Sequence, residues 1–206
     1  TYPLPLDEML LMDYRDEHMA TPEARAESER VPTFIYCMPT DDGNVFFEET
    51  SLIANPPVPF EDLKRRLYER LALWGTEVLE VEEEEFCLIP MGGAMPRVPQ
   101  RVVGFGGSAG LVHPATGYMV SRTWELAAET ADAIVSALRT NGDDAEGAAA
   151  EVWRTMWSER YMRNRDFSAF GGEYLESIGL QELREFFGAF FVLPFQQWGG
   201  FLSHRL

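Results

Sequence analysis

The feature that most constrains the fold is a glycine-rich segment between an apolar stretch and a long helical pattern. Arg101–Phe105 is short and apolar, four glycines follow within residues 104–110, and Ser121–Leu138 is rich in Ala and Leu. Strand, glycine turn and helix in this order are typical of α/β domains whose backbone approaches an anionic ligand. The sequence therefore predicts an α/β fold with a buried strand at Arg101–Phe105 and a helix at Ser121–Leu138.

Composition excludes several functional classes. A chain of 206 residues with 46% hydrophobic content can bury a substantial core. Its formal charge of −17 opposes binding to nucleic acid. Cys37 and Cys87 are too few for a disulfide framework, and no metal site is expected. Because there is no long apolar run, no signal pattern and no initiator Met, we expect a soluble or peripheral chain that is truncated.

A β-hairpin carrying two adjacent carboxylates is predicted early in the chain. Thr33–Pro39 and Val45–Ile53 are rich in aromatic and β-branched residues, and Asp41–Asn44 supplies turn residues between them. Neighbouring side chains on a strand point to opposite faces, so Glu48 and Glu49 cannot both enter one pocket.

The two glutamates should therefore have different roles. A glutamate that faces a cavity lined by Phe46, Phe47 and other rings would have a raised pKa and could act as a general acid. The other would orient it or take a proton back. A solvated pair at the rim of a sheet is the simpler interpretation of Glu48-Glu49 when the string is taken alone.

Other segments follow simpler patterns. Pro59–Trp74 is predicted to be an amphipathic helix and Thr76–Ile89 to form strands, with the acidic block Glu82–Glu85 solvated. The polar run Thr21–Arg30 is interpreted as a surface loop. Helices are expected over residues 146–165 and 174–187. The closing aromatic run, which includes Phe190, Phe191, Phe195, Trp198 and Phe201, fits either an interfacial anchor or an ordinary helical core.

The glycine-rich segment resembles the second nucleotide motif of flavin hydroxylases. Gly107-Ser108-Ala109 and Pro114-Ala115-Thr116-Gly117 stand at the matching spacing, with Ser108 where those enzymes carry Asp. His113 is either a contact to the flavin or its pyrophosphate, or a structural histidine at a turn. The flavin contacts expected from this resemblance are Gly106, Gly107, Ser108, Ala109, His113, Pro114, Thr116 and Gly117.

Six strings distributed over the chain resemble the lycopene cyclase family of plants and algae. They are Met12–Asp16, Phe46–Thr50, Cys87–Gly93, Pro99–Val103, His113–Tyr118 and Trp198–Ser203. The residues around Ile89–Gly93 and Gly117–Val120 are more similar to the β- than to the ε-type members, whereas Tyr14 and Phe47 replace the Trp and Leu most familiar in plant β-type members. Capsanthin-capsorubin and neoxanthin synthases share much of the pattern.

The resemblance implies a reaction without net redox. Each ψ-end of lycopene is protonated, the ring closes through a carbocation, and a neighbouring proton is lost. It implies an essential acid within Glu48-Glu49, substrate contacts from Phe46, Phe47 and Tyr118, non-covalent reduced FAD, and NADPH as electron donor. Lycopene and related carotenoids are the expected partners, and the expected location is the plastid, peripheral to the thylakoid or envelope membrane.

The resemblance also implies a flavin hydroxylase-like FAD/NAD(P)-binding fold whose N-terminal dinucleotide-binding unit is missing, because no Gly-x-Gly-x-x-Gly occurs here. We expect a substrate-side β-sheet portion over residues 1–100, a flavin-domain return strand and helix over 101–140, and a helical cap over 141–206. A flavin hydroxylase and a non-catalytic carotenoid- or flavin-binding protein remain the alternatives.

Overall fold

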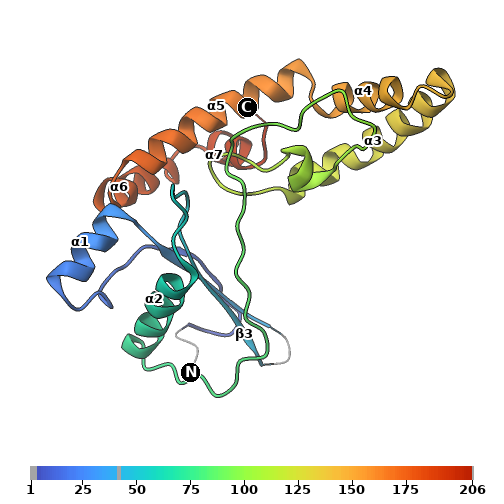
Figure 1. Cartoon of the computed structure of the whole chain (residues 1–206). Coiled ribbons are helices and arrows are strands. Elements are labelled where there is room, and N and C mark those ends of the chain that lie inside the picture. The colour runs from blue at the N-terminus through green and yellow to red at the C-terminus, as the bar shows by residue number, and fades with distance from the viewer. Residues whose placement is uncertain (1–3, 41–42, 206) are drawn as a thin grey trace. The chain divides into compact units, whose positions relative to one another are not determined.

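The computed structural model describes residues 4–40 and 43–205 and divides the chain into two compact units. The first combines Thr1–Leu88 with Glu176–Ala189, and the second combines Ile89–Leu175 with Phe190–Leu206. Three strands and seven α-helices occur in the described residues (Figure 1). The α/β prediction is confirmed at this level, while the flavin hydroxylase-like detail and the domain boundaries stay predictions.

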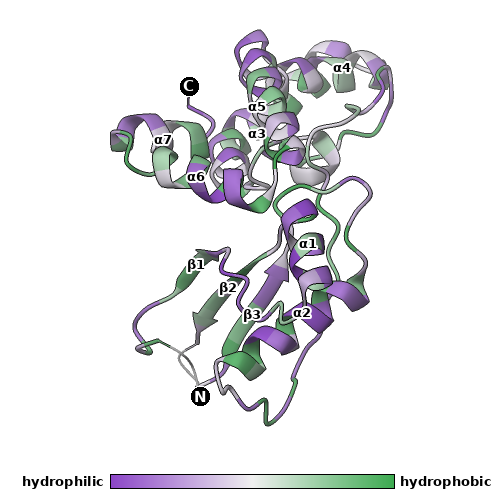
Figure 2. Ribbon diagram, turned by 90° about the vertical axis from the view of Figure 1, so that its left-hand side faces the viewer, coloured by the Kyte–Doolittle hydropathy of each residue, from purple (hydrophilic) through white to green (hydrophobic). Residues whose placement is uncertain are grey.

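The first unit is built on a three-stranded antiparallel sheet. Its strands are β1 (Leu10–Asp13), β2 (Phe34–Pro39) and β3 (Val45–Thr50), in the order β1-β2-β3 (Figure 2). The register between β2 and β3 is unbroken from Phe34 opposite Thr50 to Pro39 opposite Val45. The predicted hairpin is confirmed, and two of its turn residues, Asp41 and Asp42, lie outside the described residues.

One face of this sheet is covered by α2 (Phe60–Leu73), which confirms the predicted amphipathic helix. At the end of the sheet, the ring of Tyr14 packs on Phe34 with centroids 4.9 Å apart. Phe187 of α6 (Leu180–Phe190) stacks on the same tyrosine at 6.0 Å. These rings fix the sheet against α6 within the unit.

Two expectations for the first unit are wrong. The polar run Thr21–Arg30 is not a loop but helix α1 (Pro22–Arg30), because Thr21 accepts a hydrogen bond from the backbone N–H of Ala24 and Pro22 suits the first turn. No strand forms within Thr76–Ile89, since no strand of the described sheet pairs with it, and Leu79 is 87% exposed.

The second unit holds most of the helices. They are α3 (Val120–Asn141), α4 (Ala145–Met156), most of α5 (Glu159–Ser177) and α7 (Phe195–Leu202). The helix predicted over Ser121–Leu138 is confirmed by α3. The pattern over residues 146–165 is divided between α4 and α5, and that over 174–187 between the end of α5 and α6. The core is formed by Leu111, Leu126, Val152, Trp153, Met156 and Tyr161, among others.

The predicted buried strand at Arg101–Phe105 is wrong. The segment has no strand partner among the described residues, and Val102 is 74% exposed. The glycines instead form a short 3₁₀ helix, η1 (Gly106–Ala109), and α3 begins only at Val120. Gly110 ends η1 at φ +66°, where a Cβ would lie 2.7 Å from the Sδ of Met95, so this position requires glycine.

Candidate functional site

The two faces of the sheet separate Glu48 from Glu49. Glu48 lies opposite Tyr36 and Glu49 opposite Ile35, and side chains alternate because the register is unbroken. Glu49 is on the side that α2 covers, which we call the α2 face. The other side, called the open face, carries Tyr36, Met38, Phe46 and Glu48.

Glu49 forms a buried ion pair with Arg70 of α2. Their side chains are 1% and 2% exposed. The Nε of Arg70 donates to Oε2 of Glu49 at 2.9 Å and its Nη2 to Oε1 at 3.0 Å. The hydroxyl of Thr33 donates to the same Oε1 at 2.6 Å. Both carboxylate oxygens are therefore occupied, and neither can reach a substrate on the open face.

Glu48 has the opposite environment. Its side chain is half-buried beside the aromatic residues of the open face. Burial raises the pKa of Glu48 above its ordinary value, and the charge of Glu85 raises it further. A carboxyl group with a raised pKa keeps its proton to higher pH, which suits it to proton donation. Of the two glutamates, Glu48 is the one whose position and pKa are compatible with a general acid.

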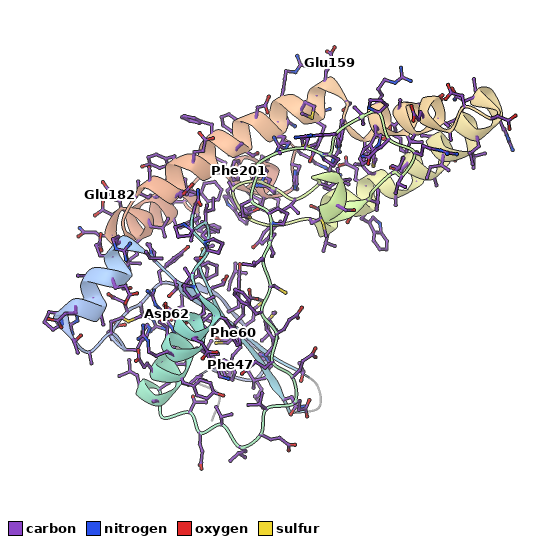
Figure 3. The ribbon with its side chains drawn as sticks, in the orientation of Figure 1. Phe47, Phe60, Asp62, Glu159, Glu182 and Phe201 are labelled. Carbon is purple, nitrogen blue, oxygen red and sulfur yellow. The ribbon has the colours of Figure 1, made fainter. Side chains whose placement is uncertain are left out.

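The two phenylalanines predicted to contact the substrate, Phe46 and Phe47, also lie on opposite faces of the sheet. Phe46 is 46% exposed on the open face, beside Glu48. Phe47 lies opposite the buried Cys37, on the α2 face. Figure 3 labels Phe47 together with Phe60 and Asp62 of α2, the helix that packs on this face. Of these two phenylalanines, Phe46 is the one that lies on the same face as Glu48.

In the second unit, part of the glycine-rich segment lines a cavity of about 290 Å³. Of the predicted flavin contacts, Gly107 and Ser108 are in its wall. Arg165 of α5 is its charged lining residue, with a side chain only 10% exposed whose Nη2 donates to the carbonyl of Gly93 at 2.6 Å. The remaining lining residues are Pro90, Gly92, Ala94, Met95, Pro96, Gly110 and Val112.

Sequence reasoning missed Arg165. It lies on a helix far along the chain from the glycines, and no local motif marks it. The helix shows no clear apolar face in its sequence, so only the folded structure reveals that the guanidinium of Arg165 borders the cavity.

His113 is fully buried and its ring nitrogens are engaged. Nδ1 accepts from the N–H of Ala115 at 3.2 Å, and Nε2 lies 3.2 Å from the hydroxyl of Ser168. Its ring contacts Phe201 and His204, with centroids 4.7 and 4.5 Å away. Burial, and then the charge of His204, lower the pKa of His113 to about 3. Of the two roles left open by the sequence, these contacts favour the structural one.

Of the other predicted contacts, Gly106 and Ala109 are buried within η1, and the rest belong to the turn that His113 begins. The N–H of His113 donates to the carbonyl of Tyr118 at 2.9 Å, and the hydroxyl of Thr116 accepts from the N–H of Tyr118 at 3.3 Å. Pro114 and Gly117 lie within this turn. Tyr118 borders a second hollow of about 710 Å³, together with Met119, Val120, Ser121, Trp124, Glu125 and Arg205.

The predicted site residues are thus found in both units, with Phe46, Phe47, Glu48 and Glu49 in the first and the glycine segment, His113 and Tyr118 in the second. Over residues 4–40 and 43–205, no group of three or more His, Cys, Asp or Glu side chains could hold a metal ion. No helix in this described part has the length and apolar character needed to cross a membrane.

Comparison with known proteins relates the whole chain to one family. A family model described as "Lycopene cyclase protein" matches residues 2–206. The chain is 45% identical over its full length to a chloroplastic lycopene beta cyclase of an Oncidium hybrid cultivar, covering 43% of that relative. It is 46% identical to the lycopene beta cyclase of Arabidopsis thaliana and 46% identical to a chromoplastic capsanthin/capsorubin synthase of Citrus sinensis, covering 42% and 41% of them.

The chain therefore spans less than half the length of these curated relatives, while all of it is included in each match. No solved structure matches the chain.

Proposed function

Since the chain belongs to the lycopene cyclase family, we propose that it is part of a lycopene β-cyclase and supplies the acid of the reaction. The observation that carries this proposal is the position of Glu48, a half-buried carboxyl with a raised pKa on an aromatic open face. Neighbouring Glu49 cannot substitute for it, because both its oxygens are bound on the α2 face.

The proposed reaction starts with proton transfer. Glu48 donates its proton to the terminal double bond of a ψ-end of lycopene, the ring closes through a carbocation, and a proton is lost from the neighbouring carbon to give the β-ring. Proton gain and loss balance, so there is no net redox. The aromatic faces of Tyr36 and Phe46 can stabilise the cation while excluding water.

We further propose that the second unit binds FAD, with NADPH as the electron source. Two features of the cavity support this proposal: Gly107 lets the backbone approach a ligand, and Arg165 offers a largely buried cation to a phosphate or to an anionic flavin ring. When bound and reduced, the flavin supplies negative charge that favours a carbocation. The chain's own contribution here is to hold and orient it.

Flavin retention tests this part of the proposal. Arg165→Gln in the complete protein is expected to weaken flavin affinity about tenfold, the loss of one charge-assisted hydrogen bond. Arg163→Gln, which removes an exposed arginine from the same helix, is the matched control. Equal affinity in both variants, measured by fluorescence titration, would remove Arg165 from the flavin site.

We propose a plastid location with peripheral attachment to the thylakoid or envelope membrane. The relatives named above are chloroplastic or chromoplastic. Residues 189–203 contain no charged side chain, and Val192 and Phe195 within them are strongly exposed, as suits contact with lipid. Co-sedimentation of the complete protein with zwitterionic vesicles, compared with Val192→Asp, tests the attachment.

The decisive experiment expresses the complete reading frame that contains this chain in lycopene-accumulating bacteria. Conversion of lycopene to β-carotene, an isomer of equal mass, is expected for the wild type. A fall of about 10²- to 10⁴-fold is expected for Glu48→Gln, the usual contribution of a general acid. Full conversion by Glu48→Gln, with flavin bound and the protein folded, would contradict the proposed role.

A synthase of the capsanthin-capsorubin or neoxanthin type is the second candidate, since the Citrus relative has the same 46% identity as a β-cyclase. Such an enzyme would convert epoxy-xanthophylls in the same assay. A flavin hydroxylase would instead consume oxygen and give products of higher mass, and a non-catalytic binder would hold pigment unchanged in both the wild type and Glu48→Gln.

A further inference from the structure

The segment Glu82–Leu88, which follows α2, is held beside strand β3. Asn44 Nδ2, just before β3, donates to Glu82 Oε1 at 2.9 Å. Lys64 of α2 pairs with Glu84 at 2.6 Å, and the ring of Phe60 meets that of Phe86 with centroids 5.2 Å apart. Figure 1 shows the chain leaving α2 and running back past β3. These contacts fix the segment along the free edge of the sheet.

The contacts of this segment alternate between two sides. From Glu83 to Leu88 the backbone forms no helix, turn or bend, and Glu84 and Phe86 both contact α2. In an extended chain, the intervening side chains of Glu85 and Cys87 point the opposite way. That direction leads away from α2, which is the side of the sheet on which Glu48 lies.

The position along the strand agrees with this orientation. Glu85 is three residues beyond Glu82, and Glu48 is four beyond Asn44, so both lie about 10–13 Å past the same anchor at the usual rise of a strand. Cys87 donates to Glu85 Oε1 at 3.0 Å and is itself influenced by the charge of Glu48. The three side chains therefore form one cluster.

We propose that Glu85, not Glu49, is the second carboxylate of the open face and is a positioning residue that keeps the proton on Glu48. Two neighbouring carboxyl groups resist ionising together, so the charge of one holds the proton of the other. The other titratable groups near Glu48 are Cys87 of the same segment and Tyr36 on β2, while Glu49 and Arg70 are on the α2 face. This inference rests on the proposed function.

The test is the pH profile of cyclisation by the complete, flavin-loaded protein. Because Glu48 acts in its protonated form, activity falls as the pH rises through its pKa. Glu85→Gln removes the repelling charge and is expected to move this alkaline limb to lower pH by about 0.5–1 unit, a loss of about 3–10-fold above the limb. The low-pH plateau and the KM for lycopene are expected to stay within about twofold, because the acid itself is intact.

Two further variants control for charge and shape. Glu85→Asp keeps the carboxylate and is expected to keep the wild-type limb. Glu80→Gln removes an exposed charge two residues before the segment and is expected to leave the profile unchanged. An unmoved limb in Glu85→Gln, or a uniform loss of activity at every pH, would overturn the proposal.

A measurement without turnover separates this inference from the proposed function. Infrared titration of the carboxylic acid C=O band that disappears in Glu48→Gln gives the pKa of Glu48 directly. A lower midpoint in Glu85→Gln supports the coupling even if Glu48→Gln were to retain cyclisation, which would count against the proposed function alone. An equal midpoint overturns the coupling whatever the activity.

Discussion

The α2 face and the open face of one small sheet differ in almost every physical property. On the α2 face, the carboxylate of Glu49 is buried in an ion pair with Arg70. On the open face, the preceding residue, Glu48, is half-buried among aromatic side chains, and its pKa is raised. A shift of one position along the strand therefore separates a buried, ion-paired carboxylate from a half-buried one with a raised pKa, because side chains alternate with period two.

The strongest test of this contrast removes the charge of Glu49. Glu49→Gln leaves the Arg70 guanidinium buried without its partner and is expected to lower the free energy of unfolding by about 3–5 kcal/mol. Glu48→Gln is the matched control, with an expected change within about 0.5 kcal/mol. Urea unfolding of the complete protein measures both, and equal losses would show that the faces do not differ as described.

Acid should act with opposite sign on Glu48 and on His18, a buried histidine under the influence of Arg70. Burial, and then the charge of Arg70, lower the pKa of His18 to about 4, so the unfolded chain takes up its proton first as the pH falls below 6.5. This costs stability, about 1–2 kcal/mol at pH 5. Glu48 has a raised pKa and contributes stability as the pH falls through that pKa.

Melting temperatures at pH 7 and pH 5 check these signs. The loss on acidification is expected to be smaller in His18→Gln than in the wild type, and larger in Glu48→Gln once the pH has fallen through the pKa of Glu48. The reverse order of these losses would show that groups other than His18 and Glu48 cause the pH dependence of stability.

A smaller effect distinguishes the neighbouring phenylalanines. Phe47→Ala removes packing on the α2 face and is expected to cost about 1–3 kcal/mol of stability. Phe46→Ala removes an exposed ring and is expected to cost less than about 0.5 kcal/mol, while raising the KM for lycopene about 3–10-fold. Thermal unfolding and substrate titration measure the two effects, and a stability loss as large in Phe46→Ala would contradict the division of the faces.

Much of the first unit follows from local sequence patterns. The period-two alternation and turn residues predicted the β2–β3 hairpin, and three- and four-residue spacing predicted α2. The same period showed that Glu48 and Glu49 point apart. Which of them is free to react could not be read from the sequence, because it depends on where Arg70 lies once α2 packs on the sheet.

The wrong secondary-structure predictions also arise because tertiary contacts are not visible in the sequence. Thr76–Ile89 and Arg101–Phe105 have strand-like composition, but a strand exists only where another strand supplies backbone hydrogen bonds, and neither segment is paired in the described sheet. Helix α1 was missed because it is polar almost throughout, although Thr21-Pro22 carries a helix-start signal. A local sequence pattern gives a preference for a secondary structure, and contacts with the rest of the fold decide whether that structure forms.

The acidic segment along β3 has a consequence for the behaviour of the chain in a crowded solution. β3 is an edge strand, and the unpaired amides of such a strand can recruit an extended segment of another molecule and begin aggregation. Anchored through Asn44 and Lys64, the segment presents four consecutive glutamates, Glu82–Glu85, to any chain that approaches this edge. Repulsion between these carboxylates and an approaching chain opposes pairing at this edge, so the segment that brings Glu85 near Glu48 also disfavours aggregation.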